Sequence, residues 1–286
     1  MGTMSELNVV GIIGSGIMGA GLAEVAAAAG FDVIVRSRTK TSADDVKVAV
    51  DKNLTRLVGK GNLENAEKTA ILERISCTDH LGRLAECDLV IESVVEDLDV
   101  KRALFAELEQ IVKADGILAT NTSTLPVVEL AIQTQRPDRV CGIHFFNPAP
   151  MMKLVEVVRP ITASDDTIKT ALQFATSCGK DAIEVTDRAG FVVNALLFPY
   201  LNNAVRMWEQ GTASKEHIDT AMQGGCNFPM GPFALLDLVG IDTSLAILEA
   251  LYDEFREPNY AAVPTLRRMV SAGKLGRKTG EGFYRY

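Results

Sequence analysis

The sequence predicts an α/β protein in which a mostly parallel β-sheet is followed by an all-α domain. Short apolar runs alternate with helical patterns along the first part of the chain, which is typical of βαβ units. A glycine-rich turn follows the first of these runs, within residues 8–19. From Gly190 onward, amphipathic helical patterns continue almost without strand signals. We therefore place the boundary near Arg188, between domains of residues 1–188 and 189–286.

The first strand leads into a turn suited to a dinucleotide. The run NVVGII is apolar, as in a strand buried on both faces, and glycines follow it at G-x-G-x-x-G spacing before a helical pattern. Gly14 permits the tight turn, Gly16 lets the backbone approach a pyrophosphate, and Gly19 lets the helix pack close to the strand. The N–H groups at the helix start then face the phosphates. The cofactor contacts predicted from this Rossmann-like pattern are Gly14, Gly16, Ile17, Met18 and Gly19.

The remaining elements follow from periodicity and turn residues. Further strands are predicted at residues 32–35, 76–78, 88–93, 116–121, 139–146, 154–158 and 182–185. Helices are predicted at residues 20–29, 99–112 and 165–178, after Pro126, and in the second domain at 191–210, 215–223, 233–255 and 264–272. Residues 41–74 read as two helices around a turn at 59–62, which is more chain than a crossover needs. We therefore expect a helical hairpin inserted at the sheet edge.

Composition and charge narrow the class of protein. The chain has 286 residues, of which 47% are hydrophobic and 23% charged, as in ordinary globular domains. A formal net charge of −8 argues against a nucleic-acid surface, which calls for a basic face. No apolar run reaches the roughly 18 residues of a membrane span, and the N-terminal residues lack a signal-peptide pattern. Five scattered cysteines without a C-x-x-C pair indicate buried thiols, and we expect a cytoplasmic protein.

The end of the second strand bears on the choice of nucleotide. NAD-binding units place a carboxylate there, which bonds the ribose 2′-OH. This chain instead has Ser37 between the cations Arg36 and Arg38, with Lys40 two residues further on. Guanidinium groups bind a 2′-phosphate in bidentate fashion. We therefore expect NADP(H), with Ser37 and Arg38 at the ribose; the alternative is a solvated basic strand end and NAD(H).

One of the three histidines stands apart. His80 and His217 have polar neighbours and are expected at the surface, whereas His144 ends an apolar strand and opens a loop. In open α/β sheets, ligands bind beyond such strand ends. Glu156 lies inside the apolar run LVEVV, so it either faces water from an edge strand or has a buried partner. A pair with His144 would orient the imidazole and raise its basicity, as acid–base catalysis requires.

Together these motifs resemble the short-chain L-3-hydroxyacyl-CoA dehydrogenase family, of the bacterial 3-hydroxybutyryl-CoA dehydrogenase type. The resemblance covers nearly the whole chain. Besides the glycine turn it includes LVIE at 89–92, NTS at 121–123, HFFNP at 144–148, KLVEVV at 153–158, GFVVN at 190–194, PMGP at 229–232 and LGRKTGEGFY at 275–284. It implies an oxidoreductase that interconverts (S)-3-hydroxybutyryl-CoA and acetoacetyl-CoA, and a homodimer formed through the helical C-terminal domain.

The resemblance also implies roles for individual residues. His144 would be the general acid–base and Glu156 would orient it, while Ser123 and Asn194 would bind the reacting oxygen or the thioester carbonyl. Because Asn194 opens the second domain, closure of that domain would complete the site. Further cofactor contacts are implied at Ser93, Glu96, Lys101, Asn121, Ser123 and Asn147, and CoA-substrate contacts at Asn53, Lys60, Ser123, His144 and Asn194; no metal is implied. The chain departs from the family at Ser37, where an aspartate is usual, and at Thr124, where a second serine is usual.

The predicted hairpin carries a basic helix face. Lys52, Arg56 and Lys60 follow at i, i+4 and i+8, so they share one side of the helix. This face is either solvated or meets the CoA phosphates, as the position of Lys60 does in the family, with Asn53 beside it.

Two other functions are compatible with parts of the pattern. A dehydrogenase of a non-CoA 3-hydroxy acid or sugar acid would share the histidine–glutamate arrangement, but the basic face argues against it. The second alternative is a non-catalytic dinucleotide-binding protein. The joint presence of Ser123, His144, Glu156 and Asn194 argues against that function.

Overall fold

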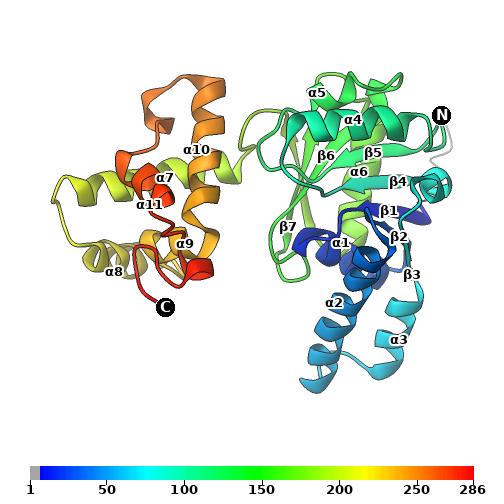
Figure 1. The fold of residues 1–286 in the computed structure, drawn as a ribbon, viewed down its shortest axis with the longest axis horizontal. Helices are drawn as coiled ribbons and strands as arrows, with labels where there is room; N and C mark the ends of the chain where they lie inside the picture. Colours follow the sequence, from blue (N-terminus) through cyan, green and yellow to red (C-terminus); the bar gives the residue numbers. More distant parts are fainter. Residues whose placement is uncertain (1–6) are drawn as a thin grey trace. The chain divides into compact units, whose positions relative to one another are not determined.

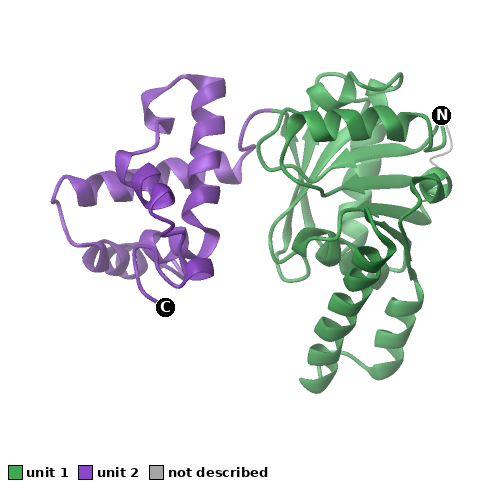
Figure 2. Ribbon diagram, viewed as in Figure 1, with its two compact units in different colours: residues 1–187 green, residues 188–286 purple. Residues whose placement is uncertain are grey.

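The computed structural model describes residues 7–286, which form two compact units. The first unit ends at Asp187 and the second begins at Arg188 (Figure 2). The signal-peptide expectation falls on N-terminal residues that lie outside the described residues. Among residues 7–286, no helix combines the length and the apolar character needed to cross a membrane.

The first unit is built on an eight-stranded sheet with the order β3-β2-β1-β4-β5-β6-β7-β8. The strands are β1 (Val9–Ile13), β2 (Asp32–Arg36), β3 (Ile75–Thr78), β4 (Leu89–Glu92), β5 (Ile117–Thr120), β6 (Val140–Phe145), β7 (Leu154–Arg159) and β8 (Asp181–Thr186). Strands β1 to β6 pair in parallel, β7 is antiparallel to β6, and β8 is parallel to β7. The predicted α/β class and strand positions are confirmed. Because β1, β2, β4, β5 and β6 run the same way, their carboxyl ends meet at one edge of the sheet.

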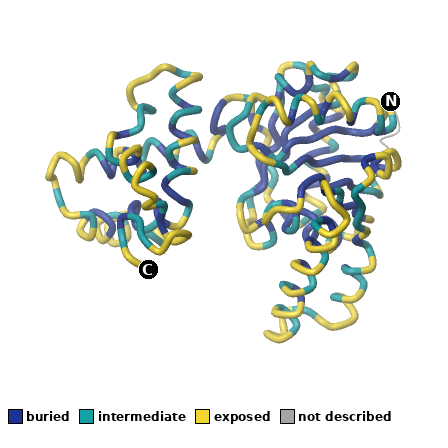
Figure 3. Tube along the Cα trace, in the orientation of Figure 1, coloured by how far each residue is buried: buried dark blue, intermediate teal, exposed yellow. Residues whose placement is uncertain are grey.

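Helices cover both faces of this sheet (Figure 1). They are α1 (Ile17–Ala28), α2 (Lys40–Gly59) and α6 (Asp165–Ser177) on one face, and α4 (Leu98–Glu109) and the short α5 (Val128–Ala131) on the other. The core of the first face joins Val10 and Val33 of the sheet to Leu22 of α1 and Phe174 of α6. The central strands are buried along most of their length (Figure 3). Burial on both faces explains why these strands are continuous apolar runs.

The predicted hairpin is formed by α2 and α3 (Asn65–Glu73), which extend away from the sheet (Figure 1). Thr39 caps α2 by accepting a hydrogen bond from Ser42 N, and Glu64 begins α3 with a reciprocal capping box to Glu67. Caps of this kind satisfy the unpaired N–H groups of the first helical turn.

The second unit is helical, as predicted. Its helices are α7 (Val193–Glu209), α8 (Lys215–Cys226), α9 (Pro232–Val239), α10 (Ile241–Phe255) and α11 (Pro264–Ser271). The single helix predicted at residues 233–255 is wrong, because Gly240 divides it into α9 and α10. Gly240 has a φ of +103°, which departs from helical geometry and redirects the chain after the last i→i−4 bond of α9, from Gly240 N–H to Leu236 O. Short 3₁₀ helices lie at Leu81–Glu86, Pro137–Arg139, Pro258–Tyr260 and Arg277–Thr279.

Candidate active site

The turn between β1 and α1 has the geometry of a phosphate-binding loop. Gly14 has a φ of +128°, and a Cβ there would lie 2.2 Å from Ser93 O. A Cβ at Gly19 would lie 2.1 Å from Gly14 O, whereas Gly16 adjoins open space. Ile17, the first residue of α1, is exposed. A bare, exposed backbone at a helix start fits the pyrophosphate of a dinucleotide.

Hydroxyl groups take the place of a carboxylate at the end of β2. Ser37 Oγ donates to Ser15 Oγ of the glycine turn at 3.0 Å and lies 2.8 Å from Ser42 Oγ. Arg36 and Arg38 form no ion pair within residues 7–286, and Arg36 Nε is buried there without a hydrogen-bond partner. Lys40 differs from them because its ammonium pairs with Asp44, one turn further along α2.

An ionic network joins the ends of β4 and β5. The Lys101 ammonium, on α4, lies 3.0 Å from Glu92 and 2.9 Å from Glu96, and the Lys101 side chain is only 1% exposed. Glu92 also accepts hydrogen bonds from Val94 N at 2.6 Å and from Thr120 Oγ1 at 2.7 Å. Lys101 is therefore placed to hold Glu96 in position, and its ammonium is enclosed by the two carboxylates.

Glu96 extends this network to the predicted Ser123. Its carboxylate accepts hydrogen bonds from Ser123 N at 3.0 Å and from the Thr122 hydroxyl. Burial alone would raise the pKa of Glu96, but the Lys101 charge and these hydrogen bonds outweigh burial and lower that pKa. Glu96 is therefore an anion at neutral pH that fixes the segment carrying Ser123.

His144 and Glu156 form a buried pair across the two antiparallel strands β6 and β7. They stand opposite each other in register, with His144 Nδ1 2.8 Å from Glu156 Oε2, and Glu156 is fully buried. The Phe146 ring lies 4.5 Å from the imidazole, centroid to centroid. Asn121 Oδ1 accepts a hydrogen bond from Phe145 N at 2.8 Å, which ties the end of β5 to the residue after His144. Of the two interpretations of Glu156, the structure therefore supports the paired one.

The other cofactor residues implied by the resemblance lie at the same edge of the sheet. Ser93 follows β4, and its N–H donates to Ile13 O beside the glycine turn at 2.7 Å. Asn121 follows β5, and Asn147 is an exposed residue of the loop after β6. The carboxyl ends of four neighbouring strands thus bring these side chains, the glycine turn and His144 to one edge.

Two implied substrate residues lie on α2 and at its end. Lys60 caps the carboxyl end of this helix and is exposed, and Asn53 lies about two turns earlier. The Asn53 amide is engaged by Glu24 of α1. Asn194 belongs to the second unit, where it lies in the first turn of α7.

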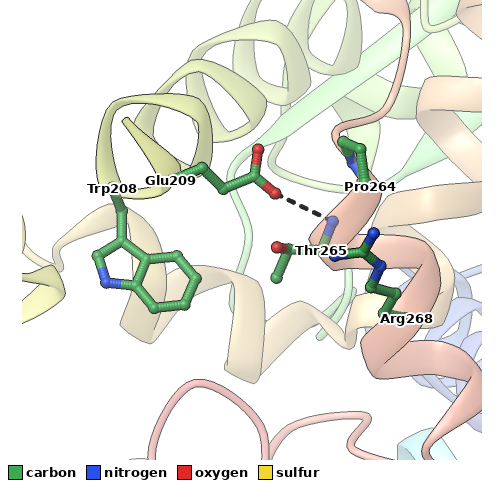
Figure 4. A pocket seen from close by; sticks show the side chains of 5 residues that line it. All are labelled: Trp208, Glu209, Pro264, Thr265 and Arg268. Atoms are coloured by element: carbon green, nitrogen blue, oxygen red, sulfur yellow. Dashed lines mark hydrogen bonds between the residues drawn. The ribbon is translucent and has the colours of Figure 1, made fainter. Parts of the chain in front are cut away.

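The second unit has a pocket of its own, of about 570 Å³ (Figure 4). Its lining residues are Trp208, Glu209, Pro264, Thr265 and Arg268. Glu209 accepts a hydrogen bond from Thr265 N at 3.1 Å, so it caps the start of α11. None of the predicted site residues lines this pocket, which we therefore consider separate from the candidate active site.

Several polar residues of the site escaped the sequence analysis. Glu92, Thr122 and Ser15 hold the β4 end, the Ser123 segment and Ser37, respectively. Glu92 carried a detectable signal, because it is an acid inside the apolar strand LVIE, the same observation that drew attention to Glu156. Thr122 and Ser15 carried none, since hydroxyl residues are common in turns.

The sheet and the glycine turn place the chain in the Rossmann class of nicotinamide-dinucleotide-binding proteins. Residues 9–188 match the family model "3-hydroxyacyl-CoA dehydrogenase, NAD binding domain", and residues 190–286 match "3-hydroxyacyl-CoA dehydrogenase, C-terminal domain". The chain therefore belongs to the 3-hydroxyacyl-CoA dehydrogenase family.

Individual proteins resemble the chain over nearly its full length. A 3-hydroxybutyryl-CoA dehydrogenase of Clostridioides difficile is 48% identical over 275 residues, which cover 96% of this chain and 98% of that protein. The crystal structure of FadB2 from M. tuberculosis has a TM-score of 0.96 at 44% identity and covers 99% of this chain and 100% of that one. The (S)-3-hydroxybutyryl-CoA dehydrogenase PaaH1 from Ralstonia eutropha has a TM-score of 0.96 at 40% identity and covers 98% and 99%.

Proposed function

We propose that this protein is an NADP(H)-dependent dehydrogenase that interconverts (S)-3-hydroxybutyryl-CoA and acetoacetyl-CoA. The observation that carries the proposal is the buried His144–Glu156 pair at the sheet edge that also bears the glycine turn. Relatives named 3-hydroxybutyryl-CoA dehydrogenase, up to 48% identical over 96% of this chain, support the choice of substrate. A protein that only bound a dinucleotide would have no use for a buried acid–base pair.

In this mechanism His144 moves the proton. The nicotinamide cofactor, when bound, supplies the hydride chemistry at C3 of the substrate. During oxidation His144 takes the proton of the 3-hydroxyl group, and in reduction it returns that proton. Glu156 holds the ring through Nδ1 and stabilises the imidazolium, so the proton is exchanged at Nε2. Ser123, and Asn194 from the second domain, bind the reacting oxygen or the thioester carbonyl and orient C3.

The surroundings of Ser37 support NADP(H) over NAD(H). The ribose 2′-OH of NAD is usually held by a carboxylate, and Ser37 occupies that position here. A 2′-phosphate needs donors, which the Ser37–Ser15–Ser42 hydroxyls and the guanidinium groups of Arg36 and Arg38 supply.

We further propose a role for each domain, a binding surface for CoA and a cellular compartment. Residues 1–188 bind the dinucleotide, and residues 189–286 contribute Asn194 and form a homodimer. The basic face of α2 with Lys60 and Asn53 binds the CoA moiety. We place the protein in a reducing cytoplasm because all five cysteines are free thiols, and burial raises the pKa of Cys87, Cys141 and Cys178 to about 12.

Reduction of acetoacetyl-CoA by the purified protein tests this function. We expect turnover, with a higher kcat/KM for NADPH than for NADH. A preference for NADH would leave the proposed reaction standing but refute the proposed NADP(H) specificity. The Arg36–Lys40 segment would then be a solvated strand end. No turnover with either nucleotide would refute the CoA substrate and direct the assays to 3-hydroxy acids and sugar acids.

A further inference from the structure

A buried lysine binds the loop between β6 and β7 and has no part in the steps described so far. Lys180 directly precedes β8 and is 9% exposed. Its ammonium donates hydrogen bonds to three backbone oxygens of that loop, Ala149 O at 2.6 Å, Met152 O at 2.8 Å and Pro150 O at 3.4 Å. An ammonium has three N–H donors, so the loop occupies all of them. Lys180 is therefore fully engaged in holding the loop and has no donor left for a ligand.

The end of α6 sets the position of Lys180. Gly179 has a φ of +71°, in the left-handed region, and Lys180 N donates to Ala175 O at 3.1 Å. A glycine in this conformation ends a helix and turns the chain. Burial lowers the pKa of Lys180, while the charge of Glu24 on α1 opposes this fall. The lysine that holds the loop is thus placed by α6 and attracted by a carboxylate of α1.

The same loop also packs against α1, the helix that follows the glycine turn. A Cβ at Gly21 of α1 would lie 3.0 Å from Ala149 Cβ and 3.4 Å from Pro150 Cδ. The first of these distances is shorter than an ordinary van der Waals contact, so a glycine at this position lets the loop approach the helix. Ala149 is accordingly only 2% exposed. The loop is therefore held both by Lys180 and by its packing against α1.

The order of the strands indicates which half of a dinucleotide this loop adjoins. Neighbouring strands of the sheet run in the order β2-β1-β4-β5-β6. A Rossmann-type sheet binds the adenosine ribose at the end of β2 and the pyrophosphate at the β1–α1 turn, so the nicotinamide half extends toward the ends of β4 to β6. Asn147 is an exposed residue of the loop, three positions after His144. It therefore belongs to the nicotinamide half of the site, where the proposed proton transfer takes place.

We propose that Lys180 and Gly21 fix the distance between the pyrophosphate site and Asn147, so that the loop is in place to accept the nicotinamide half of the cofactor. Lys180 is a positioning residue, because it acts through the loop and not on the ligand. These roles rest on the dehydrogenase function proposed above, with Asn147 as a cofactor contact. A loop that is already ordered loses less conformational freedom when the cofactor binds, so affinity rises.

Two ligands that differ only in the nicotinamide test this role by calorimetric titration. NADPH carries the ring, whereas 2′-phospho-ADP-ribose lacks it and keeps the rest of the nucleotide. For N147A we expect Kd for NADPH to rise about fivefold, because one hydrogen bond is lost. For K180M we expect a rise of roughly threefold, because the loop remains but is less ordered. Kd for 2′-phospho-ADP-ribose should not change in either variant. If the wild type prefers NADH, then NADH and ADP-ribose are the matched ligands.

Further variants separate positioning from a general structural role. In K180M/N147A, Kd for NADPH should equal that of N147A alone, since Lys180 acts through Asn147. G21A crowds Ala149 without removing a buried charge, and alanine favours the helix by about 1 kcal/mol, so this variant tests the loop even if K180M does not fold. We expect it to raise Kd for NADPH roughly threefold and to leave that for 2′-phospho-ADP-ribose unchanged. The control K169M, at an exposed lysine of α6, should change neither Kd.

The outcomes for this role and for the proposed reaction can be told apart. Equal rises with both ligands, or a K180M effect that persists in the N147A background, would overturn the role of Lys180. If the wild type binds NADPH with this dependence on Lys180 but does not reduce acetoacetyl-CoA, the positioning role stands and the proposed reaction fails. If it reduces acetoacetyl-CoA and both K180M and G21A bind NADPH like the wild type, the reaction stands and the positioning role fails.

Discussion

Glu156 Oε2 lies 2.8 Å from His144 Nδ1, and the two residues stand opposite each other on antiparallel neighbouring strands. Their side chains therefore project from the same face of the sheet. A pleated strand pair sets the distance between opposite residues, so the backbone itself fixes this contact. Both side chains are buried, which keeps water from competing for the Nδ1–carboxylate bond.

Replacement of His144 by Ala should abolish most turnover. Loss of the group that carries the proton is expected to lower kcat by about 10²- to 10⁴-fold. Binding of NADPH, measured by nucleotide fluorescence, should persist, because the glycine turn is on other strands. H80A, at an exposed histidine, is the control and should behave like the wild type. Unchanged turnover in H144A would refute the proposed mechanism.

Replacement of Glu156 by Gln should also lower kcat, by up to about 10⁴-fold, since the imidazolium loses its anionic partner. The amide keeps the size of the carboxylate, so the fold of β6 and β7 should persist and KM for NADPH should change little. Steady-state kinetics combined with circular dichroism would check both expectations. A normal kcat in E156Q would show that the charge of Glu156 has no part in catalysis.

Introducing the missing acid at Ser37 should reverse the nucleotide preference. In S37D a carboxylate would repel the 2′-phosphate and accept a bond from the 2′-OH of NAD. We expect kcat/KM for NADPH to fall roughly 10- to 100-fold and that for NADH to rise. S37A is the matched variant, because it removes the hydroxyl without adding charge and should affect NADPH far less. An unaltered ratio of the two kcat/KM values in S37D would argue that the ribose does not reach Ser37.

The Asp88 carboxylate, which binds the start of β1, should make the free energy of unfolding depend on pH. Asp88 accepts hydrogen bonds from Val9 N at 2.8 Å and Asn8 N at 2.7 Å, and pairs with Lys113. Burial raises the pKa of Asp88, but Lys113 and the two N–H groups outweigh it and lower that pKa. A lowered pKa in the folded state stabilises the protein above the unfolded pKa of about 3.9, and this contribution disappears as the pH falls through the folded pKa.

The variant D88N should therefore be less stable than the wild type by about 1–2 kcal/mol at pH 7. The gap should close as the pH is lowered from about 4, where the wild-type carboxylate begins to be protonated. Urea unfolding at a series of pH values would measure this gap. D115N, at an exposed aspartate, should show none of this dependence. If the difference in stability between the wild type and D88N does not change with pH, the loss comes from packing and not from the charge of Asp88.

In the second unit, Asp237 should be the most sensitive polar position. This buried carboxylate accepts hydrogen bonds from Phe283 N and Tyr284 N, both at 2.8 Å, and from Tyr286 Oη at 3.2 Å. D237N turns one acceptor into a donor that faces these groups, and we expect a loss of about 1–3 kcal/mol. Thermal unfolding and faster proteolysis of the C-terminal segment would report it. The exposed substitution D253N is the control and should leave both readouts unchanged.

The fold could be predicted from the sequence to the extent that it rests on local patterns. The buried strands, the glycine turn and the inserted hairpin all have periodicity or turn residues that are visible in a short window. Gly240 was missed because a single glycine within an apolar helical pattern weakens a helix by only about 1 kcal/mol. What ends α9 there is tertiary, since the next residue, Ile241, donates its N–H to Leu275 O.

The candidate site, like the fold, could be predicted only where it rests on local sequence patterns. His144 and Glu156 are close in sequence and share a hairpin, so their pairing could be inferred. The contact between Glu24 and Asn53 spans 29 residues and two helices, and no local pattern reports which helix faces meet. The burial of Lys101 likewise depends on how α4 packs against the sheet. Its contacts with Glu92 and Glu96 could therefore not be inferred from the sequence around Lys101.

The reversal of strand direction between β6 and β7 has a consequence for how such an enzyme arises. Residues that gather at the edge of a parallel sheet are separated in sequence by whole crossover helices, and so they change independently. The acid–base pair is different, because one hairpin, in which its two members stand 12 positions apart, supplies both groups and sets their distance. Such a hairpin is one continuous segment, so it can be inherited or transferred as a unit. A dinucleotide-binding sheet that acquires it at its edge gains both members of the proton-transfer pair together.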